Sequence, residues 1–238
     1  GVDMAFLAAG EGRRMYGVTT PSEMPNKWAM SVRVPVGVVA VITAWNFPLA
    51  VPTWKIFPAL VAGNTIVFKP SEESPETAVH LVEVLLEAGL PPGVINLVHG
   101  DGAKVGAPLV QHPGIDLVSF TGSNAVGTWI AEECAKRGKR VSLEMGGKNA
   151  IVVMDDADLK LAADAIAWAA FGTTGQRCTA TSRVIVHETV HDTLLAEVVK
   201  RAEALKVGNG LDEAAQMGPV VNRKQLAKIE GFAGHVIT

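Results

Sequence analysis

The chain has 238 residues, of which 48% are apolar, and a formal net charge of −3. This length suits one large domain or two small ones, and the apolar content is ample for a packed core. Lysines and arginines are scattered along the chain, so no nucleic-acid partner is expected. The longest apolar run, residues 36–45, is shorter than the ~20 residues of a bilayer-spanning helix, so no membrane partner is expected.

Cysteine content and the chain ends add two expectations. Two cysteines cannot build a disulfide framework, which favours a reducing compartment, and we expect the cytoplasm. The chain begins at Gly1 without a methionine or targeting segment, and it ends at residues 235–238, soon after a helix-like stretch over 222–230. We therefore expect an internal piece of a longer protein.

Residues 1–34 are expected to be the end of an N-terminal segment and a linker. Helix formers over 4–16 predict a helix that breaks at Gly17, and Pro21, Pro25 and Asn26 predict a turn-rich link. The alternation over 31–34 predicts a short strand.

Residues 35–147 alternate strongly between apolar strands and helices. The run over 38–42 is continuously apolar, as in a parallel strand that is covered on both faces. Ser74 is the expected N-cap, and Pro75 the first residue, of a helix that Gly89 closes. This alternation predicts a Rossmann-like, doubly wound parallel α/β sheet. The expected strands are 38–42, 65–68, 94–98, 117–121 and 141–143, and the expected helices are 53–62, 75–88, 104–110 and 125–137.

Residues 148–238 predict part of a second α/β domain. Strands are expected over 150–154 and 183–186, and helices over 158–170 and 193–204, the first of them capped by Asp158.

A glycine-flanked stretch over 172–182 holds one of the two cysteines, Cys178. A thiolate is the strongest side-chain nucleophile, so a cysteine on such a loop suits an electrophilic carbonyl substrate. The alternative is a small buried hydrophobe, which is the common state of a free cysteine. The other cysteine, Cys134, lies within a predicted helix and is expected in the core.

Three further stretches favour the nucleophile. They are residues 45–48 (Trp-Asn-Phe-Pro), 69–72 (Lys-Pro-Ser-Glu) and 143–149 (Leu-Glu-Met-Gly-Gly-Lys-Asn), and Glu144 precedes Cys178 by 178 − 144 = 34 positions. In this order, the four stretches resemble the aldehyde dehydrogenase superfamily almost from end to end. The resemblance implies an oligomerisation region over 1–34, an NAD-binding domain over 35–147 and an incomplete catalytic domain over 148–238. It also implies a homo-oligomer, a dimer or tetramer, in the full-length protein.

The cofactor site is expected where strands end. Residues 122–127 turn from a strand directly into a helix, which suits a pyrophosphate, although neither this turn nor Gly100, Gly102 and Gly106 match the dinucleotide fingerprint. Glu72 could accept hydrogen bonds from ribose hydroxyls and would repel a 2′-phosphate. NAD is therefore expected, and NADP stays open. No metal is expected. The resemblance implies cofactor contacts from Ile42, Trp45, Lys69, Ser71, Glu72, Gly102, Gly106, Phe120, Gly122, Ser123, Val126, Met145 and Gly146.

The expected chemistry is oxidation of a small-molecule aldehyde to a carboxylic acid through a thiohemiacetal and a thioester. Cys178 attacks the aldehyde, and the Asn46 amide with the Cys178 N–H stabilises the alkoxide. Glu144 activates the water that hydrolyses the thioester. The resemblance also assigns Lys69 to the catalytic set.

Three readings stay open on sequence alone: this oxidation, a CoA-acylating relative, and a non-catalytic nucleotide-binding or structural module. Glu144 argues against CoA acylation, which needs no water-activating base. Arg177 could attract a carboxylate that the substrate carries in addition to its aldehyde group, and the sequence around Arg177 resembles some semialdehyde dehydrogenases. Uncovered strand edges lead us to expect that an isolated 1–238 chain is weakly stable, oligomeric and inactive.

Overall fold

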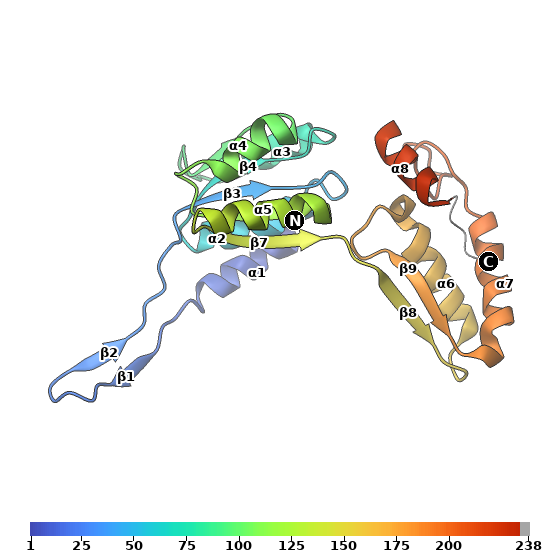
Figure 1. The fold of residues 1–238 in the computed structure, drawn as a ribbon, viewed down its shortest axis with the longest axis horizontal. Coiled ribbons are helices and arrows are strands. Elements are labelled where there is room, and N and C mark those ends of the chain that lie inside the picture. The colour runs from blue at the N-terminus through green and yellow to red at the C-terminus, as the bar shows by residue number, and fades with distance from the viewer. Residues whose placement is uncertain (234–238) are drawn as a thin grey trace. The chain divides into compact units, whose positions relative to one another are not determined.

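The computed structural model describes residues 1–233, and the expected chain end at 235–238 lies outside them. The chain divides into two compact units, Gly1–Met145 and a second that begins at Gly146 (Figure 1).

The first unit opens with helix α1 (Val2–Gly12) and a hairpin of strands β1 (Thr19–Pro21) and β2 (Trp28–Met30). The helix starts earlier and ends earlier than expected, and its C-terminal end holds Gly10 and Gly12, which disfavour helix. The strand predicted over 31–34 is wrong. Asn26, at φ 62°, turns the chain so that 28–30 pair with 19–21 instead.

Five parallel strands form the central sheet, in the order β5-β4-β3-β6-β7. Counted along the chain this is order 3-2-1-4-5, which matches the doubly wound arrangement, with its switch point between β3 and β6. The predicted parallel sheet is therefore confirmed. The strands are β3 (Val38–Ile42), β4 (Thr65–Lys69), β5 (Ile95–Leu97), β6 (Leu117–Gly122) and β7 (Arg140–Met145).

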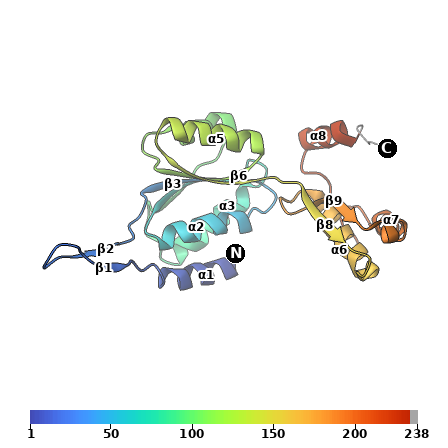
Figure 2. The same cartoon turned by 60° about the horizontal axis from the view of Figure 1, so that its bottom comes forward.

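Helices cover both faces of this sheet, with α5 on one side and α2 and α3 on the other (Figure 2). Val39 and Val41 face a core that includes Ile56 of α2 (Ala50–Val61) and Leu81 of α3 (Pro75–Glu87). The alternate residues of β3 pack with α4 (Ala107–Gln111) and α5 (Asn124–Lys136). Because both faces are covered, β3 reads as one continuous apolar run.

The helix ends test the predicted caps. Ser123 caps α5, with its Oγ accepting from the Val126 N–H at 3.4 Å. Ser74 lies at the N-cap of α3, but its side chain makes no capping hydrogen bond. Helix α2 begins at Ala50, three residues earlier than expected, because a helix tolerates Pro52 in its first turn. The helix expected over 104–110 begins as a π-helical turn, η1 (Gly102–Gly106), before α4.

The second unit contains a two-stranded parallel sheet, β8 (Asn149–Val153) and β9 (Thr181–Val186). Asp158 caps α6 (Leu159–Phe171) as predicted, and it accepts from the N–H groups of Lys160 and Leu161. A short 3₁₀ turn, η3 (Glu188–Val190), precedes α7 (His191–Glu203), and α8 (Arg223–Ala233) follows later. Val153, Ala163, Ile166 and Leu194 form the small core. The exposed apolar side chains of this sheet include Val152, Val184 and Ile185.

Across residues 1–233, no helix combines the length and the apolar character that a membrane crossing requires.

Candidate active site

The switch point of the first unit brings several predicted cofactor residues together. Ile42 of β3 and Phe120 of β6 pair in register, and both are buried. Gly122 is the last residue of β6, Ser123 is the N-cap of α5, and the exposed Val126 lies in the first turn of that helix. In doubly wound sheets, ligands bind at this point beyond the carboxyl ends of the strands.

The Phe120 ring leaves no room for a side chain at Gly122. A Cβ atom at this position would lie 2.3 Å from Cζ of the Phe120 ring. The absence of a side chain therefore lets the chain turn directly above that ring, and it keeps the backbone amides accessible at the start of α5.

Thr121 is a residue that sequence reasoning missed. Its Oγ1 is buried and has no hydrogen-bond partner among the described residues. Buried hydroxyls are normally paired, so Thr121 is a candidate ligand contact at the switch point. Its position one residue before Gly122 was the available signal.

Lys69 ends β4 with its ammonium group buried. Nζ donates to the Pro70 carbonyl at 3.0 Å and pairs with Oε2 of Glu72 at 3.4 Å, while the Glu72 side chain is 55% exposed. Glu72 therefore lies just beyond the end of β4, where its exposed side chain can accept hydrogen bonds from hydroxyl groups. Ser71 is buried beside them.

The glycine cluster after β5 differs between its two predicted members. Gly106 is buried, and a Cβ atom there would lie 3.7 Å from the Lys69 side chain, so Gly106 lies beside Lys69. Gly102 is exposed, and a Cβ atom there would meet nothing within 4 Å. Asp101 caps η1 by accepting from the Ala103 and Lys104 N–H groups, which lowers the pKa of Asp101.

Trp45 and Asn46 lie half-buried on the loop between β3 and α2. This loop leaves β3 at the switch point, so Asn46 belongs to the same edge of the sheet as Gly122. The role of Asn46 as an oxyanion donor stays a prediction.

Glu144 and Met145 end β7, where they pair in register with Thr121 and Gly122. The Glu144 side chain is exposed. Gly146, the last predicted cofactor residue, opens the second unit.

Lys55 is a second residue that sequence reasoning missed. It is the one charged residue of α2, and its Nζ donates to Oγ of Ser119 at 3.2 Å and to the Phe120 carbonyl at 3.1 Å. Burial lowers the pKa of Lys55, and the charge of Glu144 opposes that shift. The two groups are therefore electrostatically coupled. A single lysine in an apolar helix was the signal in the sequence.

The predicted nucleophile, Cys178, is exposed, and it follows a short 3₁₀ turn, η2 (Gly172–Gly175). Its carbonyl accepts from Nδ2 of Asn149 at 2.7 Å. Cys134 is fully buried on α5, and burial raises the pKa of its thiol. The buried Cys134 agrees with the prediction of a core residue, and the exposure of Cys178 argues against the alternative of a small buried hydrophobe.

Arg177 does not extend toward solvent. Its NH2 group donates to the carbonyls of Trp168 and Ala169, and its Cζ lies 4.1 Å from the centroid of the Trp168 ring. This geometry argues against the interpretation that Arg177 attracts a substrate carboxylate.

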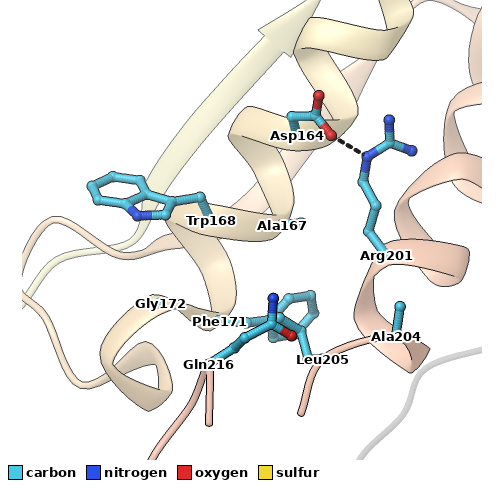
Figure 3. A pocket seen from close by; sticks show the side chains of 9 residues that line it. All are labelled: Asp164, Ala167, Trp168, Phe171, Gly172, Arg201, Ala204, Leu205 and Gln216. Carbon is cyan, nitrogen blue, oxygen red and sulfur yellow. Dashed lines mark hydrogen bonds and ion pairs between the residues drawn. The ribbon is translucent and has the colours of Figure 1, made fainter. Parts of the chain in front are cut away.

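The second unit also holds a cavity of about 380 Å³ between α6, α7 and the segment after α7 (Figure 3). The ion pair of Asp164 and Arg201 lies on its wall. None of the predicted catalytic or cofactor residues lines it. Within residues 1–233, no cluster of three or more His, Cys, Asp or Glu side chains could hold a metal ion.

Comparison with known proteins gives a consistent result. Residues 1–237 match the family model described as the aldehyde dehydrogenase family. The chain is 46% identical over 226 residues to alpha-ketoglutaric semialdehyde dehydrogenase of Bacillus subtilis, covering 95% of this chain and 46% of that protein. The chain thus spans about half the length of the curated relatives it matches.

Two solved structures extend the likeness to the fold. Betaine aldehyde dehydrogenase from Staphylococcus aureus, in complex with NAD+, superposes with a TM-score of 0.93 at 38% identity, covering 96% of this chain and 45% of that one. An NADP-dependent enzyme of E. coli gives 0.91 at 40% identity, covering 95% and 47%. With the family model matching nearly every residue, the chain belongs to the aldehyde dehydrogenase family.

Proposed function

We propose that the protein containing this chain oxidises an aldehyde to a carboxylic acid, with NAD as the hydride acceptor. The observation that carries the proposal is that a chain of this family presents an exposed Cys178 on a tethered loop and Glu144 at the end of a sheet strand. The first supplies the nucleophile and the second the base.

The cofactor site supports a dinucleotide. The buried, unpaired hydroxyl of Thr121 and the turn at Gly122, where a Cβ atom has no room, are features that a bound ligand would explain. Glu72 would accept the hydroxyls of a ribose, with Lys69 beside it. Its negative charge would disfavour a 2′-phosphate, so NAD is preferred over NADP. When bound, the nicotinamide accepts the hydride.

The first half of the reaction is acylation. The Cys178 thiolate attacks the aldehyde carbon, and the carbonyl electron pair moves onto oxygen to form a thiohemiacetal alkoxide. The Asn46 amide and the Cys178 N–H are the proposed donors to that oxygen. Loss of hydride from the same carbon then leaves a thioester on Cys178.

The second half is hydrolysis of the thioester. Glu144 takes a proton from water, the resulting hydroxide attacks the thioester carbon, and the carbon–sulfur bond breaks to release the acid and the thiolate.

The proposed substrate class is an aldehyde that also carries a carboxylate group. Its support is the likeness to the semialdehyde dehydrogenase of Bacillus subtilis, because Arg177 is engaged elsewhere. Equal kcat/KM for a carboxylated aldehyde and its neutral analogue would reject this class and leave the oxidation itself standing.

Two further proposals concern the whole protein. We propose a homo-oligomer, dimer or tetramer, supported by the exposed hairpin β1–β2, on which Trp28 and Met30 present apolar surface. Sedimentation of the full-length protein with and without Trp28→Ser tests it. We also propose a cytoplasmic location, because both cysteines are free thiols.

The direct test of function is NADH formation by the full-length protein. Production of NADH and acid from an aldehyde without CoA supports the proposal. Dependence on CoA would indicate an acylating enzyme, and nucleotide binding without turnover would indicate a non-catalytic module. Repeating the assay with NADP measures the expected preference for NAD.

A further inference from the structure

The guanidinium of Arg177 lies at the carboxyl-terminal end of α6. Its NH2 group donates to the Trp168 carbonyl at 2.8 Å and to the Ala169 carbonyl at 3.1 Å, and the Trp168 ring lies against it. Both carbonyls belong to the last turn, where a helix has more acceptors than intrahelical donors. Helix α6 has no basic residue in that turn, so Arg177, six residues beyond Phe171, supplies the positive charge that favours a helix carboxyl terminus.

The segment between α6 and Arg177 is strained. Thr173 and Thr174 have φ of 55° and 59°, in the left-handed region that β-branched residues rarely adopt. Such conformations persist where the surroundings impose them. Two tethers come from one later segment: Oγ1 of Thr174 donates to the Gly218 carbonyl at 2.9 Å, and Oε1 of Gln176 accepts from the Val221 N–H at 3.1 Å.

Both peptide planes that meet at Cys178 are held by hydrogen bonds. The Arg177 carbonyl accepts from the Ala180 N–H at 3.1 Å, and because a peptide unit is planar this bond also orients the Cys178 N–H. The Cys178 carbonyl accepts from Nδ2 of Asn149 at 2.7 Å. The direction of the nucleophile therefore depends on where the Arg177 backbone is held.

We propose that Arg177 is a positioning residue for Cys178. By binding the end of α6, its side chain fixes the backbone that carries the thiol and the Cys178 N–H. This inference rests on the proposed function for its catalytic consequence, but the anchoring itself is independent of it. Arginine suits the role because its planar guanidinium can stack on the Trp168 ring while Nη2 donates to both carbonyls, whereas lysine supplies a point charge without a plane to stack.

The first experiment measures anchoring without any turnover. Amide hydrogen exchange over residues 173–180 is compared between the wild-type protein and Arg177→Met. Arg223→Met is the control, because it removes an exposed arginine of the same unit. We expect faster exchange in Arg177→Met, partial recovery in Arg177→Lys and no change in Arg223→Met. Unchanged exchange in Arg177→Met would overturn the proposal.

The second experiment measures the catalytic consequence in the full-length protein. We expect Arg177→Met to lower kcat for a carboxylated aldehyde and for its neutral analogue by the same factor, between about 10-fold and 10²-fold, since small displacements of reacting groups have effects of this size. KM and melting temperature should change little, and Arg177→Lys should recover part of kcat. A loss confined to the carboxylated aldehyde, with raised KM, would instead make Arg177 a substrate-binding residue.

The two failures are distinguishable. If the wild-type protein oxidises no aldehyde, the proposed function fails, while the exchange comparison still decides whether Arg177 anchors the loop. If oxidation is normal and kcat is unchanged in Arg177→Met, the positioning role fails and the proposed function stands.

Discussion

The first unit places its proposed functional groups at the ends of strands, whereas the second holds the loop of its proposed nucleophile, Cys178, with hydrogen bonds from side chains. Lys69, Gly122 and Glu144 lie at or beside the carboxyl ends of β4, β6 and β7, in a sheet that helices cover on both faces. Cys178 lies on a loop with left-handed threonines, beside a two-stranded sheet with exposed apolar side chains. The ends of strands in a sheet that is covered on both faces need little further support, while an irregular loop needs individual anchors.

This difference suggests how each unit should respond to mutation. Groups of the first unit should be removable one at a time without disturbing their neighbours, because the sheet backbone positions them. Around Cys178, a change in one anchor should affect the whole loop. The predictions below test this contrast and the proposed roles, beginning with the largest expected effect.

Replacing the nucleophile gives the largest effect. Cys178→Ala in the full-length protein should abolish aldehyde oxidation and hydrolysis of activated esters together, because both require the same thiolate attack. Steady-state assays of both reactions check this. Cys134→Ala, which removes the buried thiol, is the matched control and should stay active. Ester hydrolysis that survives in Cys178→Ala would reveal another nucleophile.

Glu144→Gln should separate the two halves of the reaction. The first hydride transfer should remain, and release of the acid should slow by about 10²-fold to 10⁴-fold, the usual contribution of a general base. Stopped-flow measurement should show a burst of NADH followed by slow turnover, with Glu132→Gln on α5 as the control. Normal ester hydrolysis without a burst would contradict the assigned role.

Asn46→Ala tests the oxyanion donor on the loop after β3. Removal of one such donor typically lowers kcat by about 10²-fold to 10³-fold. The fold and NAD affinity should be retained, since the sheet positions this loop. Asn96→Ala on β5 is the control, and kinetics of the two variants give the comparison. A kcat close to that of the wild-type protein would remove Asn46 from the site.

The two cores should differ in their sensitivity to truncation. Ile56 is fully buried against the central sheet, and Ile185 on β9 is 58% exposed. Ile56→Ala should lower the free energy of unfolding by about 2–5 kcal/mol. Ile185→Ala should change it by about 0.5 kcal/mol or less, as for a surface position. Urea unfolding of residues 1–238 measures both, and equal losses would show that the two sheets are equally buried.

The smallest effect concerns acid stability of the first unit. Glu133 accepts from Lys136 and Gln111 and pairs with Arg137, and these contacts lower the pKa of Glu133 to about 2. A lowered folded-state pKa stabilises the protein above the ordinary value of 4.5, and this stabilisation is lost as the pH falls toward 2. Glu133→Gln should therefore be less stable than wild type at pH 7, with the difference shrinking below pH 4.5.

Chemical unfolding at a series of pH values from 7 to 2.5 measures that difference, with Glu132→Gln as the control for loss of one charge on α5. A stability difference that is constant over the series would show that the Glu133 carboxylate is not stabilised by these contacts.

Much of the fold followed from the sequence because its signals are local. The apolar run of β3, the glycine that ends β6 and the Asp158 cap all depend on residues that are neighbours along the chain. The position of Cys178 on a loop within a glycine-flanked stretch was predicted on the same basis, and its role as nucleophile stays a prediction. The hairpin register was missed, because the alternation over 31–34 resembles a strand whether or not a partner exists.

Only the tertiary structure decided which side chains meet. Lys55 reaches Ser119 across 64 positions, and Asn149 reaches the Cys178 carbonyl across 29. Arg177 turns back to α6, although its sequence context suggested a substrate carboxylate. Periodicity and caps are set by a residue and its near neighbours, so the sequence predicts them. Contacts between distant segments depend on how complete elements pack, and no short stretch of the chain contains that information.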